Sequence, residues 1–381
     1  MSGIYIHIPF CKKACHYCNF HFSTQTQYLN EFTEALIKEI ELQQKYISGK
    51  IETLYFGGGT PSLLSNEALQ SILNQLRNHF DFDTDFEFTL EANPDDLSSA
   101  AAASWLEIGV NRLSIGIQSF QAHSLAWMNR AHSVEQAHQA IQNAQAAGFT
   151  NMSADLIYGT PHLSDQDLRQ DLQILLDYNI PHISCYALTV EEKTALFSMI
   201  QKKNLQDIDT SQQARHFDLI IETLEDAGWE HYEISNFSKP NHRSKHNSNY
   251  WNGVPYLGLG PAAHSYNKHS RQWNVANNQL YFQSIKKNTV PFEIESLNSS
   301  AQFNEYMMIS LRKMEGCSLK IIRNEFGEKY EAHVKSLAAT YLQKNQLKQT
   351  AIGFALTKEA KFFADGIASD FFWINEPTGS L

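Results

Sequence analysis

Six short apolar runs alternate with helical patterns through the first half of the chain, and this alternation limits the possible folds most strongly. Runs rich in β-branched and aromatic residues are typical of buried strands, whereas the segments between them repeat apolar residues every three to four positions. Parallel strands need a long crossover, usually a helix, so the pattern predicts an α/β fold around a mainly parallel sheet. The predicted strands are 4–8, 53–56, 86–90, 112–117, 152–157 and 182–188.

The helical segments carry recognisable ends. Several begin with Ser or Asn, which cap helix N-termini, and two end near Gly109 and Gly148, which suit helix C-caps. The regular spacing favours a βα barrel, partial or closed, and in such a fold ligands lie at the carboxyl ends of the strands. The predicted helices are 28–45, 66–80, 98–108, 133–147 and 164–178.

The second half of the chain changes character. After another amphipathic helix at 211–228, the sequence becomes rich in Asn, Gly, Pro and aromatic residues. From residue 302 onward, helical patterns lead into a short hairpin, which is typical of a small winged-helix-like domain. We therefore expect three parts: a barrel over 1–230, a connecting segment over 231–300 and a C-terminal domain over 301–381.

Charge excludes some partners. The 381 residues contain 30 Lys and Arg against 41 Asp and Glu, a net charge of −11. This acidity disfavours non-specific binding to nucleic acid or to an anionic membrane. From residue 302, ten basic residues face nine acidic ones, which is not the balance of a dedicated nucleic-acid domain. The composition predicts no nucleic-acid partner.

The chain shows no targeting feature. Its first residues lack the basic start and apolar stretch of a secretory signal, and no apolar run reaches the roughly 18 residues that cross a bilayer. We expect a cytoplasmic protein without an integral membrane segment. Whether it is a monomer or a homodimer stays open at this point.

Three of the five cysteines cluster. Cys11, Cys15 and Cys18 form a C-x-x-x-C-x-x-C pattern directly after the first predicted strand. In a reducing compartment such a cluster indicates a metal site, and three thiolates on one loop can hold three irons of a 4Fe-4S cluster. The fourth iron would then be open to a ligand. Cys185 and Cys317 are isolated in apolar surroundings, and we expect them to be ordinary buried thiols.

A zinc site is the alternative for this loop. Three cysteines and one histidine can complete a tetrahedral zinc site, and the sequence offers His7, His16 or His21 as the fourth ligand. Structural zinc more often closes with two separated pairs of ligands, which this loop lacks.

A glycine motif follows the second predicted strand. Gly57, Gly58 and Gly59 in GGGTP let the backbone approach a ligand closely. The alternative is a strand-to-helix turn without a ligand. Polar residues also end the later strands or follow them by one loop, where this architecture places ligand contacts. These residues are Glu91, Gln118, Arg130 and Asp155.

The cysteine triad, Tyr17 before its last cysteine and GGGTP together resemble the radical S-adenosylmethionine superfamily. The resemblance implies a partial βα barrel that holds a 4Fe-4S cluster on Cys11, Cys15 and Cys18. It also implies that S-adenosylmethionine chelates the open iron and is cleaved by an electron from the cluster.

Over residues 3–375 the chain is similar to the oxygen-independent coproporphyrinogen III oxidase-like family within that superfamily. The similarity implies S-adenosylmethionine contacts around the mouth of the barrel. They fall on Tyr5, Tyr17, Gly58, Gly59, Thr60, Glu91, Gln118, Arg130, Asp155, Ala187 and His264.

Two features distinguish the branches of that family. The porphyrinogen-decarboxylating oxidases have the pattern C-x-x-x-C-x-x-C-x-C, and an N-terminal extension precedes it. This chain has Phe20 at the position of the fourth cysteine and only ten residues before Cys11. The segment HNSNYW at 246–251 instead resembles the signature of a haem-chaperone branch. We therefore expect no coproporphyrinogen III oxidase activity.

The resemblance to that branch implies a chaperone that binds haem and passes it to an acceptor protein, which we expect in respiratory metabolism. An electron donor would serve the cluster. The alternatives are an oxygen-independent coproporphyrinogen III oxidase-like radical enzyme and, more remotely, a radical enzyme acting on RNA.

Haem contacts are expected in HNSNYW. His246 could ligate iron, and Tyr250 or Trp251 could stack on a porphyrin. The alternative is an ordered loop held by buried aromatic residues and Asn hydrogen bonds. The sequence leaves open which atom contacts iron.

Overall fold

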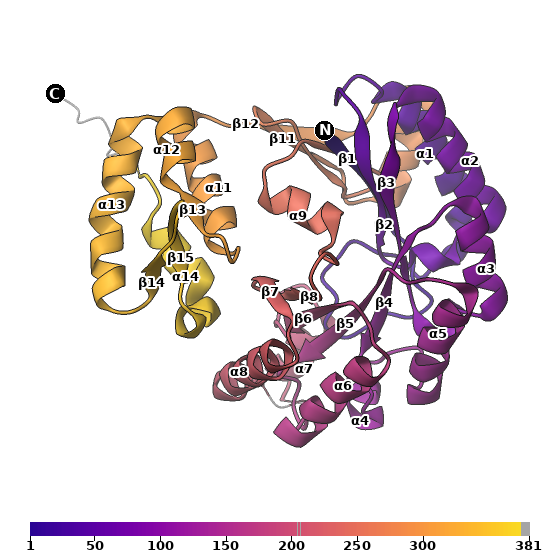
Figure 1. Cartoon of the computed structure of the whole chain (residues 1–381). Coiled ribbons are helices and arrows are strands. Elements are labelled where there is room, and N and C mark those ends of the chain that lie inside the picture. Colours follow the sequence, from indigo (N-terminus) through magenta and orange to yellow (C-terminus); the bar gives the residue numbers. More distant parts are fainter. Residues whose placement is uncertain (204, 206, 375–381) are drawn as a thin grey trace.

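The computed structural model describes residues 1–203, 205 and 207–374. Twelve strands form one sheet in the order β12-β11-β10-β9-β1-β2-β3-β4-β5-β6-β8-β7 (Figure 1). Its two ends are β12 and β7, so in the described part of the chain the sheet is open and forms a partial barrel. The fold class predicted from the sequence is confirmed.

The first six strands pair in parallel and in chain order, with helices between them. Each predicted strand and helix of this half is present, with ends shifted by a few residues. The strands are β1 Ser2–Ile8, β2 Ile51–Gly58, β3 Phe82–Ala92, β4 Arg112–Gln118, β5 Met152–Tyr158 and β6 His182–Ala187. The helices are α1 Leu29–Leu42, α2 Asn66–His79, α3 Ser99–Ile108, α4 Ala122–Trp127, α5 Val134–Ala147, α6 Asp165–Asp177, α7 Ala195–Gln201 and α8 Thr210–Asp226.

The expected helix ends are confirmed. Ser98 and Ser133 accept hydrogen bonds from backbone N–H groups in the first turns of α3 and α5. Gly109 and Gly148 end these helices with φ of 109° and 107°, a left-handed backbone that glycine adopts without strain. The four α-helices that follow a Ser cap in this half therefore begin where the sequence indicates.

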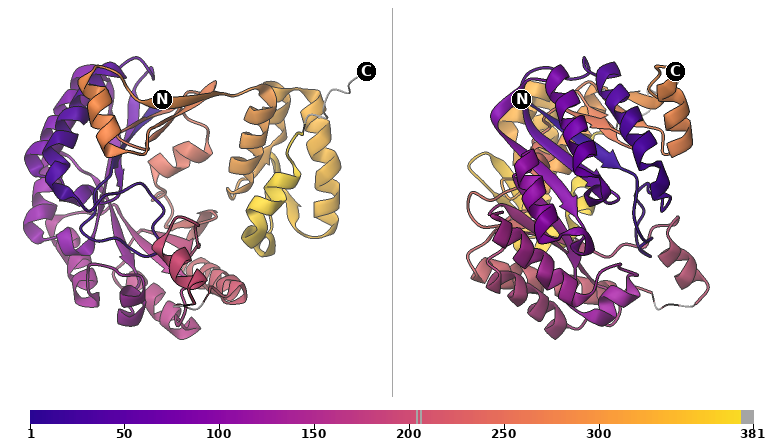
Figure 2. Two further views of the ribbon diagram at one scale, coloured as in Figure 1. Left: turned by 180° about the vertical axis from the view of Figure 1, so that it is seen from behind. Right: turned by 90° about the vertical axis from the view of Figure 1, so that its right-hand side faces the viewer.

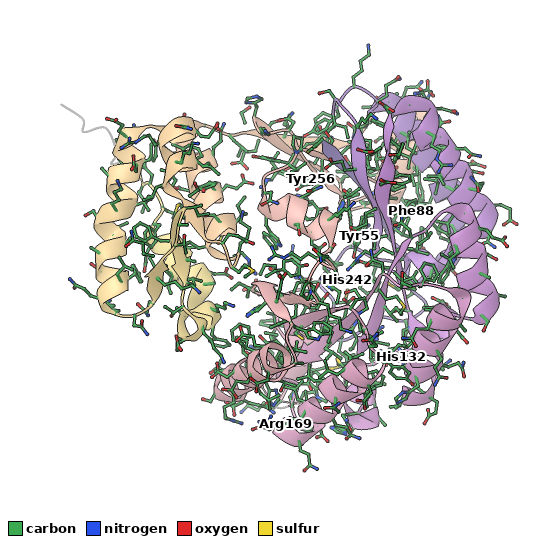
Figure 3. The ribbon with its side chains drawn as sticks, in the orientation of Figure 1. Tyr55, Phe88, His132, Arg169, His242 and Tyr256 are labelled. Carbon is green, nitrogen blue, oxygen red and sulfur yellow. The ribbon has the colours of Figure 1, made fainter. Side chains whose placement is uncertain are left out.

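The two faces of the parallel sheet differ in chemistry. On the outer face, Ile4, Ile6 and Ile8 of β1 are buried against the helices. Alternate residues face inward toward α9 (Lys245–Trp251), so Tyr5 and Tyr55 come to the inner face. Figure 3 labels Tyr55 beside α9, with Phe88 farther toward the helices. The crossover helices cover the outer face, whereas α9 lies on the inner side of the sheet, so the polar inner wall faces the interior of the partial barrel (Figure 2).

Residues 230–296 add six more strands to this sheet, although the sequence predicts a connecting segment over 231–300. β9 pairs in parallel with β1, and β8 pairs antiparallel with β6. These strands have three to five residues, too few for a periodic pattern to stand out. They are β7 Glu230–Glu233, β8 Asn236–Ser238, β9 Tyr256–Leu259, β10 His264–Tyr266, β11 Ser270–Asn274 and β12 Phe292–Ser296, with α9 and α10 Asn278–Lys286 between them.

Residues 299–374, the C-terminal segment, enclose a hydrophobic cluster of their own around Phe303 and Val334. Their strands form a separate sheet in the order β13-β15-β14. The elements are α11 Ser299–Leu311, β13 Cys317–Ser318, α12 Leu319–Phe326, α13 Glu328–Gln343, β14 Leu347–Gln349, β15 Gly353–Leu356 and α14 Ala364–Asp370.

The C-terminal segment contacts the barrel through the turn after α11. The backbone N–H of Met314 donates to the carbonyl of Tyr232 on β7 (3.0 Å), and α9 lies between the sheet and this segment (Figure 1). The three-part division of the chain at residues 230 and 300 stays a prediction, and the last residues of the predicted third part, 375–381, lie outside the described part.

None of the helices within the described residues is long and apolar enough to span a membrane.

Candidate functional site

The three clustered cysteines lie on the loop between β1 and the first helix, residues 9–23, which we call the cysteine loop. Its base is closed where Cys11 N donates to Ser23 O (3.0 Å) and Ser23 N donates to Pro9 O (2.9 Å). All three thiols are free and half-buried, whereas the predicted bystanders Cys185 and Cys317 are buried, as expected.

The three thiols are close enough to affect each other's charge. Desolvation, and to a smaller extent the nearby Cys18 and Cys15, raise the pKa of Cys11 to about 11. The pKa of Cys18 is also raised, first by desolvation and then by Cys15 among other groups. A positively charged metal centre bound at this loop would deprotonate such thiols.

A distant segment shapes the loop. His16 donates from its backbone N to Met128 O (3.2 Å) and from Nδ1 to Trp127 O (2.9 Å). Asn129, with φ of 59°, donates to Ala14 O (2.7 Å). These contacts place Arg130, the next residue, against the thiols.

Arg130 links the cysteine loop to the strand ends. Its Nη1 lies 3.4 Å from Cys15 Sγ and 3.4 Å from Tyr17 Oη, and its Nη2 donates to Asn93 Oδ1 (2.8 Å) and Gly116 O (2.9 Å). Its Nε is buried without an acceptor. The guanidinium can therefore neutralise thiolate charge and still donate to a ligand.

The histidines of the zinc alternative are engaged elsewhere. His7 Nε2 donates to His21 O (2.8 Å), so its Nδ1 accepts from Tyr5 Oη (3.1 Å). Burial lowers the pKa of His7 to about 4, and His21 Nε2 bonds to Asn278 Oδ1 (2.7 Å). Among the described residues, no three His, Cys, Asp or Glu side chains gather as ligands of a single metal ion.

The glycine motif packs against the cysteine loop. A Cβ on Gly59 would lie 2.6 Å from Phe10 O and 3.0 Å from Cys11 Sγ, and Gly58 has φ of 106° with His7 packed against it. Only glycine fits such an approach. Thr60 is buried, and its hydroxyl accepts from Asn93 Nδ2 (3.2 Å).

Two carboxyl groups lie on the inner face, near the carboxyl ends of β3 and β5. Glu91 accepts from Tyr55 Oη (2.7 Å) and from Gly58 N (3.2 Å), and desolvation raises its pKa to about 8. Asp155 accepts from Ser114 Oγ (3.3 Å), and desolvation raises its pKa to about 6. A cationic ligand beside these groups would favour their charged forms.

The remaining predicted contacts border the same region. Gln118 ends β4 with φ of 66°, and its Nε2 lies next to Gly116. Ala187 ends β6 beside Tyr158. His264 begins β10, is exposed and stacks on Trp273. The structure thus brings the predicted residues together along the carboxyl ends of the parallel strands, which we call the rim. Their contacts with a cofactor stay predictions.

The structure adds residues that the sequence did not single out. Asn93 bonds to both Arg130 and Thr60, and Tyr55 orients Glu91. Tyr55 could have been found, because it lies two residues before Gly57 and so on the same face of β2. Asn93, in LEANPD, gave no comparable signal.

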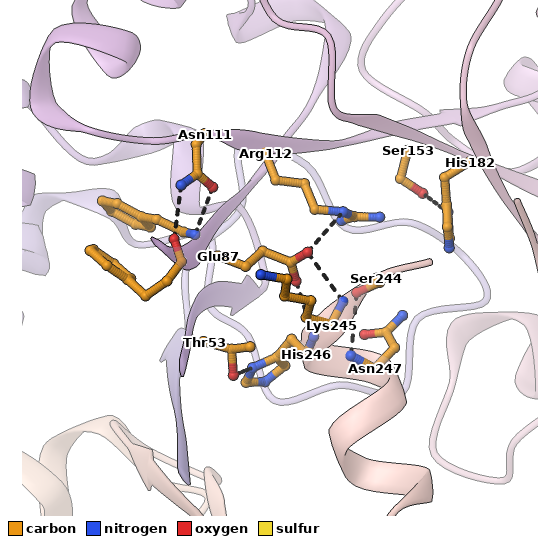
Figure 4. A network of polar contacts seen from close by, with 12 residues as sticks. Thr53, Glu87, Asn111, Arg112, Ser153, His182, Ser244, Lys245, His246 and Asn247 are labelled. Atoms are coloured by element: carbon orange, nitrogen blue, oxygen red, sulfur yellow. Dashed lines mark hydrogen bonds and ion pairs between the residues drawn. The ribbon is translucent and has the colours of Figure 1, made fainter. Parts of the chain in front are cut away.

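The HNSNYW segment forms α9, whose first residues are fastened to the inner wall (Figure 4). Glu87 accepts from the backbone N–H groups of Lys245 (3.1 Å) and His246 (3.0 Å). The buried Arg112 lies 3.9 Å from the same carboxylate. Neither Glu87 nor Arg112 was predicted, because a single charged residue within a strand has no motif around it.

His246 is closed in on all sides. It is 2% exposed, its Nδ1 is bonded to Thr53 Oγ1 (2.8 Å) and its Nε2 to Tyr250 Oη (2.9 Å). Its ring stacks on Tyr55 at 4.9 Å, and burial lowers its pKa to about 3. Both nitrogens of this neutral imidazole are therefore occupied by protein partners.

Tyr250 and Trp251 differ from His246 because both are half-buried. Tyr250 also packs edge-on against Tyr256, while the guanidinium of Arg312 lies 5.3 Å from the Trp251 ring centre. Trp251 therefore lies where α9 meets the C-terminal segment.

Comparisons with known proteins agree with this geometry. The model of the radical SAM superfamily matches residues 5–175. The "Heme chaperone HemW" of Bacillus subtilis (strain 168) is 32% identical over 375 residues, which cover 97% of this chain and 99% of the relative. The protein of the same name from Mycobacterium tuberculosis (strain ATCC 25618 / H37Rv) is 36% identical over 336 residues, covering 87% of this chain and 86% of the relative.

A solved structure shares the fold. Coproporphyrinogen III oxidase (HemN) from Escherichia coli, described as a radical SAM enzyme, aligns with a TM-score of 0.84 over 97% of this chain and 90% of that chain. Its sequence identity is 21%, so the likeness shows the architecture alone.

Proposed function

The chain belongs to the family of the heme chaperone HemW, within the radical SAM superfamily, and from that premise we propose that it binds haem and transfers it to an acceptor protein. The observation that carries the proposal is the extent of the similarity. It continues over 97% of the chain, well beyond the superfamily segment, and so includes HNSNYW and the C-terminal segment.

The cysteine loop suits a 4Fe-4S cluster. Cys11, Cys15 and Cys18 would each hold one iron, and soft thiolates are the usual ligands of such clusters. Arg130, 3.4 Å from Cys15 Sγ, would balance part of the thiolate charge. When bound, the cluster supplies the electron for reductive cleavage of S-adenosylmethionine.

The rim next to the loop suits S-adenosylmethionine. Glu91 and Asp155 offer carboxylates to ammonium and hydroxyl groups, while the unpaired Nε of Arg130 offers a donor to a carboxylate. Gly58, Gly59 and Thr60 let the ligand approach the backbone. Further contacts in this proposal are Tyr5, Tyr17, Gln118, Ala187 and His264.

For haem, we propose that α9 contributes Tyr250 and Trp251 as ring contacts. His246 could ligate iron only in a conformation in which its bonds to Thr53 and Tyr250 are broken. In the conformation described here, His246 holds α9 against the barrel instead.

The proposal includes partners and a place. An electron donor would serve the cluster, an acceptor protein would take the haem, and the chain would act as a monomer or homodimer. Free thiols at the cluster loop suit the reducing cytoplasm.

The test is an anaerobic titration of the full chain with haemin, before and after cluster reconstitution. We expect a stoichiometric change of the haem Soret band and delivery of the haem to an apo-haem protein such as apomyoglobin. Trp251→Phe should weaken the binding more than Trp273→Phe, a matched change at another tryptophan.

Two results would contradict the proposal. One is the absence of a stoichiometric Soret change with and without the cluster. The other is the decarboxylation of coproporphyrinogen III by the reconstituted protein, which would favour the oxidase alternative. Phe20 disfavours that alternative, because it stands at the position where the porphyrinogen-decarboxylating oxidases have a fourth cysteine.

A further inference from the structure

A pocket of about 280 Å³ lies between α9, β7 and the turn that follows α11. It is separate from the rim of strand ends, and its walls include Tyr232, Arg243, Ser248, Trp251, Lys313 and Glu315. Pockets that hold drug-sized ligands span about 300–1,000 Å³. This pocket therefore suits one edge of a flat ligand rather than a whole macrocycle.

Arg243 is fully engaged by protein partners. Its Nε donates to Glu230 Oε2 (3.0 Å), its Nη1 to Glu315 Oε1 (2.7 Å) and its Nη2 to Met314 Sδ (2.9 Å). The guanidinium also lies 5.3 Å from the ring centre of Tyr232. Arg243 thus joins the barrel to the C-terminal segment and is not free to bind a ligand.

Lys313 is the cation of this pocket that forms no ion pair among the described residues. Its Nζ donates to Asn252 Oδ1 (3.0 Å), which is a neutral amide oxygen. Within the residues that the structure describes, Lys313 makes no ion pair, since no carboxylate oxygen lies within 4.0 Å of its Nζ. Glu315, which also lines the pocket and is paired with Arg243, compensates part of the charge of Lys313. Burial nevertheless lowers the pKa of Lys313, so an anion at its Nζ would stabilise the half-buried ammonium group.

A second donor belongs to Trp251, a residue that lines the same pocket. Trp251 Nε1 is buried without an acceptor, and the ring of Trp251 provides a flat apolar wall. The guanidinium of Arg312, which is paired with Asp365, lies 5.3 Å from the centre of that ring and packs against it. An ammonium group without an ion pair, a buried indole N–H without an acceptor and aromatic walls together favour an aromatic ligand that carries a carboxylate.

We propose that this pocket binds a carboxylate-bearing edge of the haem and that Lys313 pairs with a haem propionate. This inference rests on the proposed function and extends it, because it makes the haem site shared between α9 and the C-terminal segment. It also gives Trp251 a role that does not require His246 to leave the barrel.

The experiment compares two probes on the full chain: haemin, and haemin dimethyl ester, in which both propionates are esterified. We expect Lys313→Gln to weaken haemin binding about tenfold, as the loss of one charge-assisted contact does, and to leave ester binding unchanged. Lys313→Arg should retain most of the haemin affinity. Lys320→Gln, at an exposed lysine of α12, is the matched control and should change neither affinity.

Each other outcome overturns the inference. Equal loss of haemin and ester binding in Lys313→Gln would indicate a structural role, and unchanged haemin binding would show that Lys313 does not contact the ligand. If the unmodified chain binds neither probe, the proposed function fails as well. Haemin binding that is insensitive to Lys313 removes only the present inference. Thermal unfolding of each variant checks that the fold is retained.

Discussion

The cysteine loop and α9 are both short motifs with strong metal ligands, yet they present those ligands in opposite ways. The thiols of Cys11, Cys15 and Cys18 are half-buried at a rim, and a cation stands beside them. The imidazole of His246 is enclosed, with both nitrogens bonded to protein groups. A motif therefore identifies the residue type, but the partners around it decide whether the donor atom can be used.

The largest effect that tests this difference is expected in the cysteine loop. Cys15→Ala should abolish assembly of the iron-sulfur cluster, because a cubane held by two protein thiolates loses one of its three anchors. Iron and sulfide content and the visible absorption after reconstitution measure this. Cys317→Ala, at a buried cysteine of the C-terminal segment, should retain both; full iron and sulfide in Cys15→Ala would show that the triad is misassigned.

A smaller effect is expected for α9, and it concerns stability. His246→Ala should lower the free energy of unfolding by about 3 kcal/mol, because it opens a cavity and leaves the buried Thr53 hydroxyl without its partner. Denaturant unfolding of the cluster-free chain measures it, with the exposed His269→Ala as control. A loss no larger than the control's would mean that the ring does not hold α9 to the barrel.

The smallest effect concerns pH at the rim. The folded chain raises the pKa of Glu91 to about 8, mainly through desolvation, so the folded state binds a proton more tightly than the unfolded state. Stability without cofactors should therefore decrease as the pH rises from about 4.5 to about 8. The change is on the order of 2 kcal/mol, because the half-buried carboxyl keeps some contact with water.

Glu91→Gln removes the titrating group and should flatten this pH dependence. Urea unfolding at several pH values compares the two proteins, and Glu107→Gln, on the outer helix α3, is the control. An unchanged slope in Glu91→Gln would assign the pH dependence to other carboxyl groups, such as Asp155 with its pKa of about 6.

Much of the first half was predictable because its signals are local. Six strands and their crossover helices extend over enough residues for the apolar period to be visible, and the caps Ser98, Ser133, Gly109 and Gly148 are chemical necessities of helix ends. The short strands β7–β12 could not be recognised in the same way. Their pairing with β1 and β6 depends on residues far away in the sequence.

The same distinction applies to the candidate site. The cysteine spacing and the glycines predict a cluster loop because both ligands and close approach are encoded within a few residues. The Arg130 contact with Cys15 spans 115 residues, and Glu87 meets the start of α9 across 159 residues. No local sequence pattern indicates a contact between residues so far apart in the chain.

The amino-acid sequence by itself determined the α/β class, the cysteine loop, the glycine turn and the family to which the chain belongs. Each of these depends on neighbouring residues and on chemistry that a short segment carries with it. Only the tertiary structure decided that His246 is enclosed, that Arg130 lies beside the thiols and that Lys313 lines a pocket without forming an ion pair among the described residues. The physical reason is that burial and the pairing of charges are properties of groups brought together by folding.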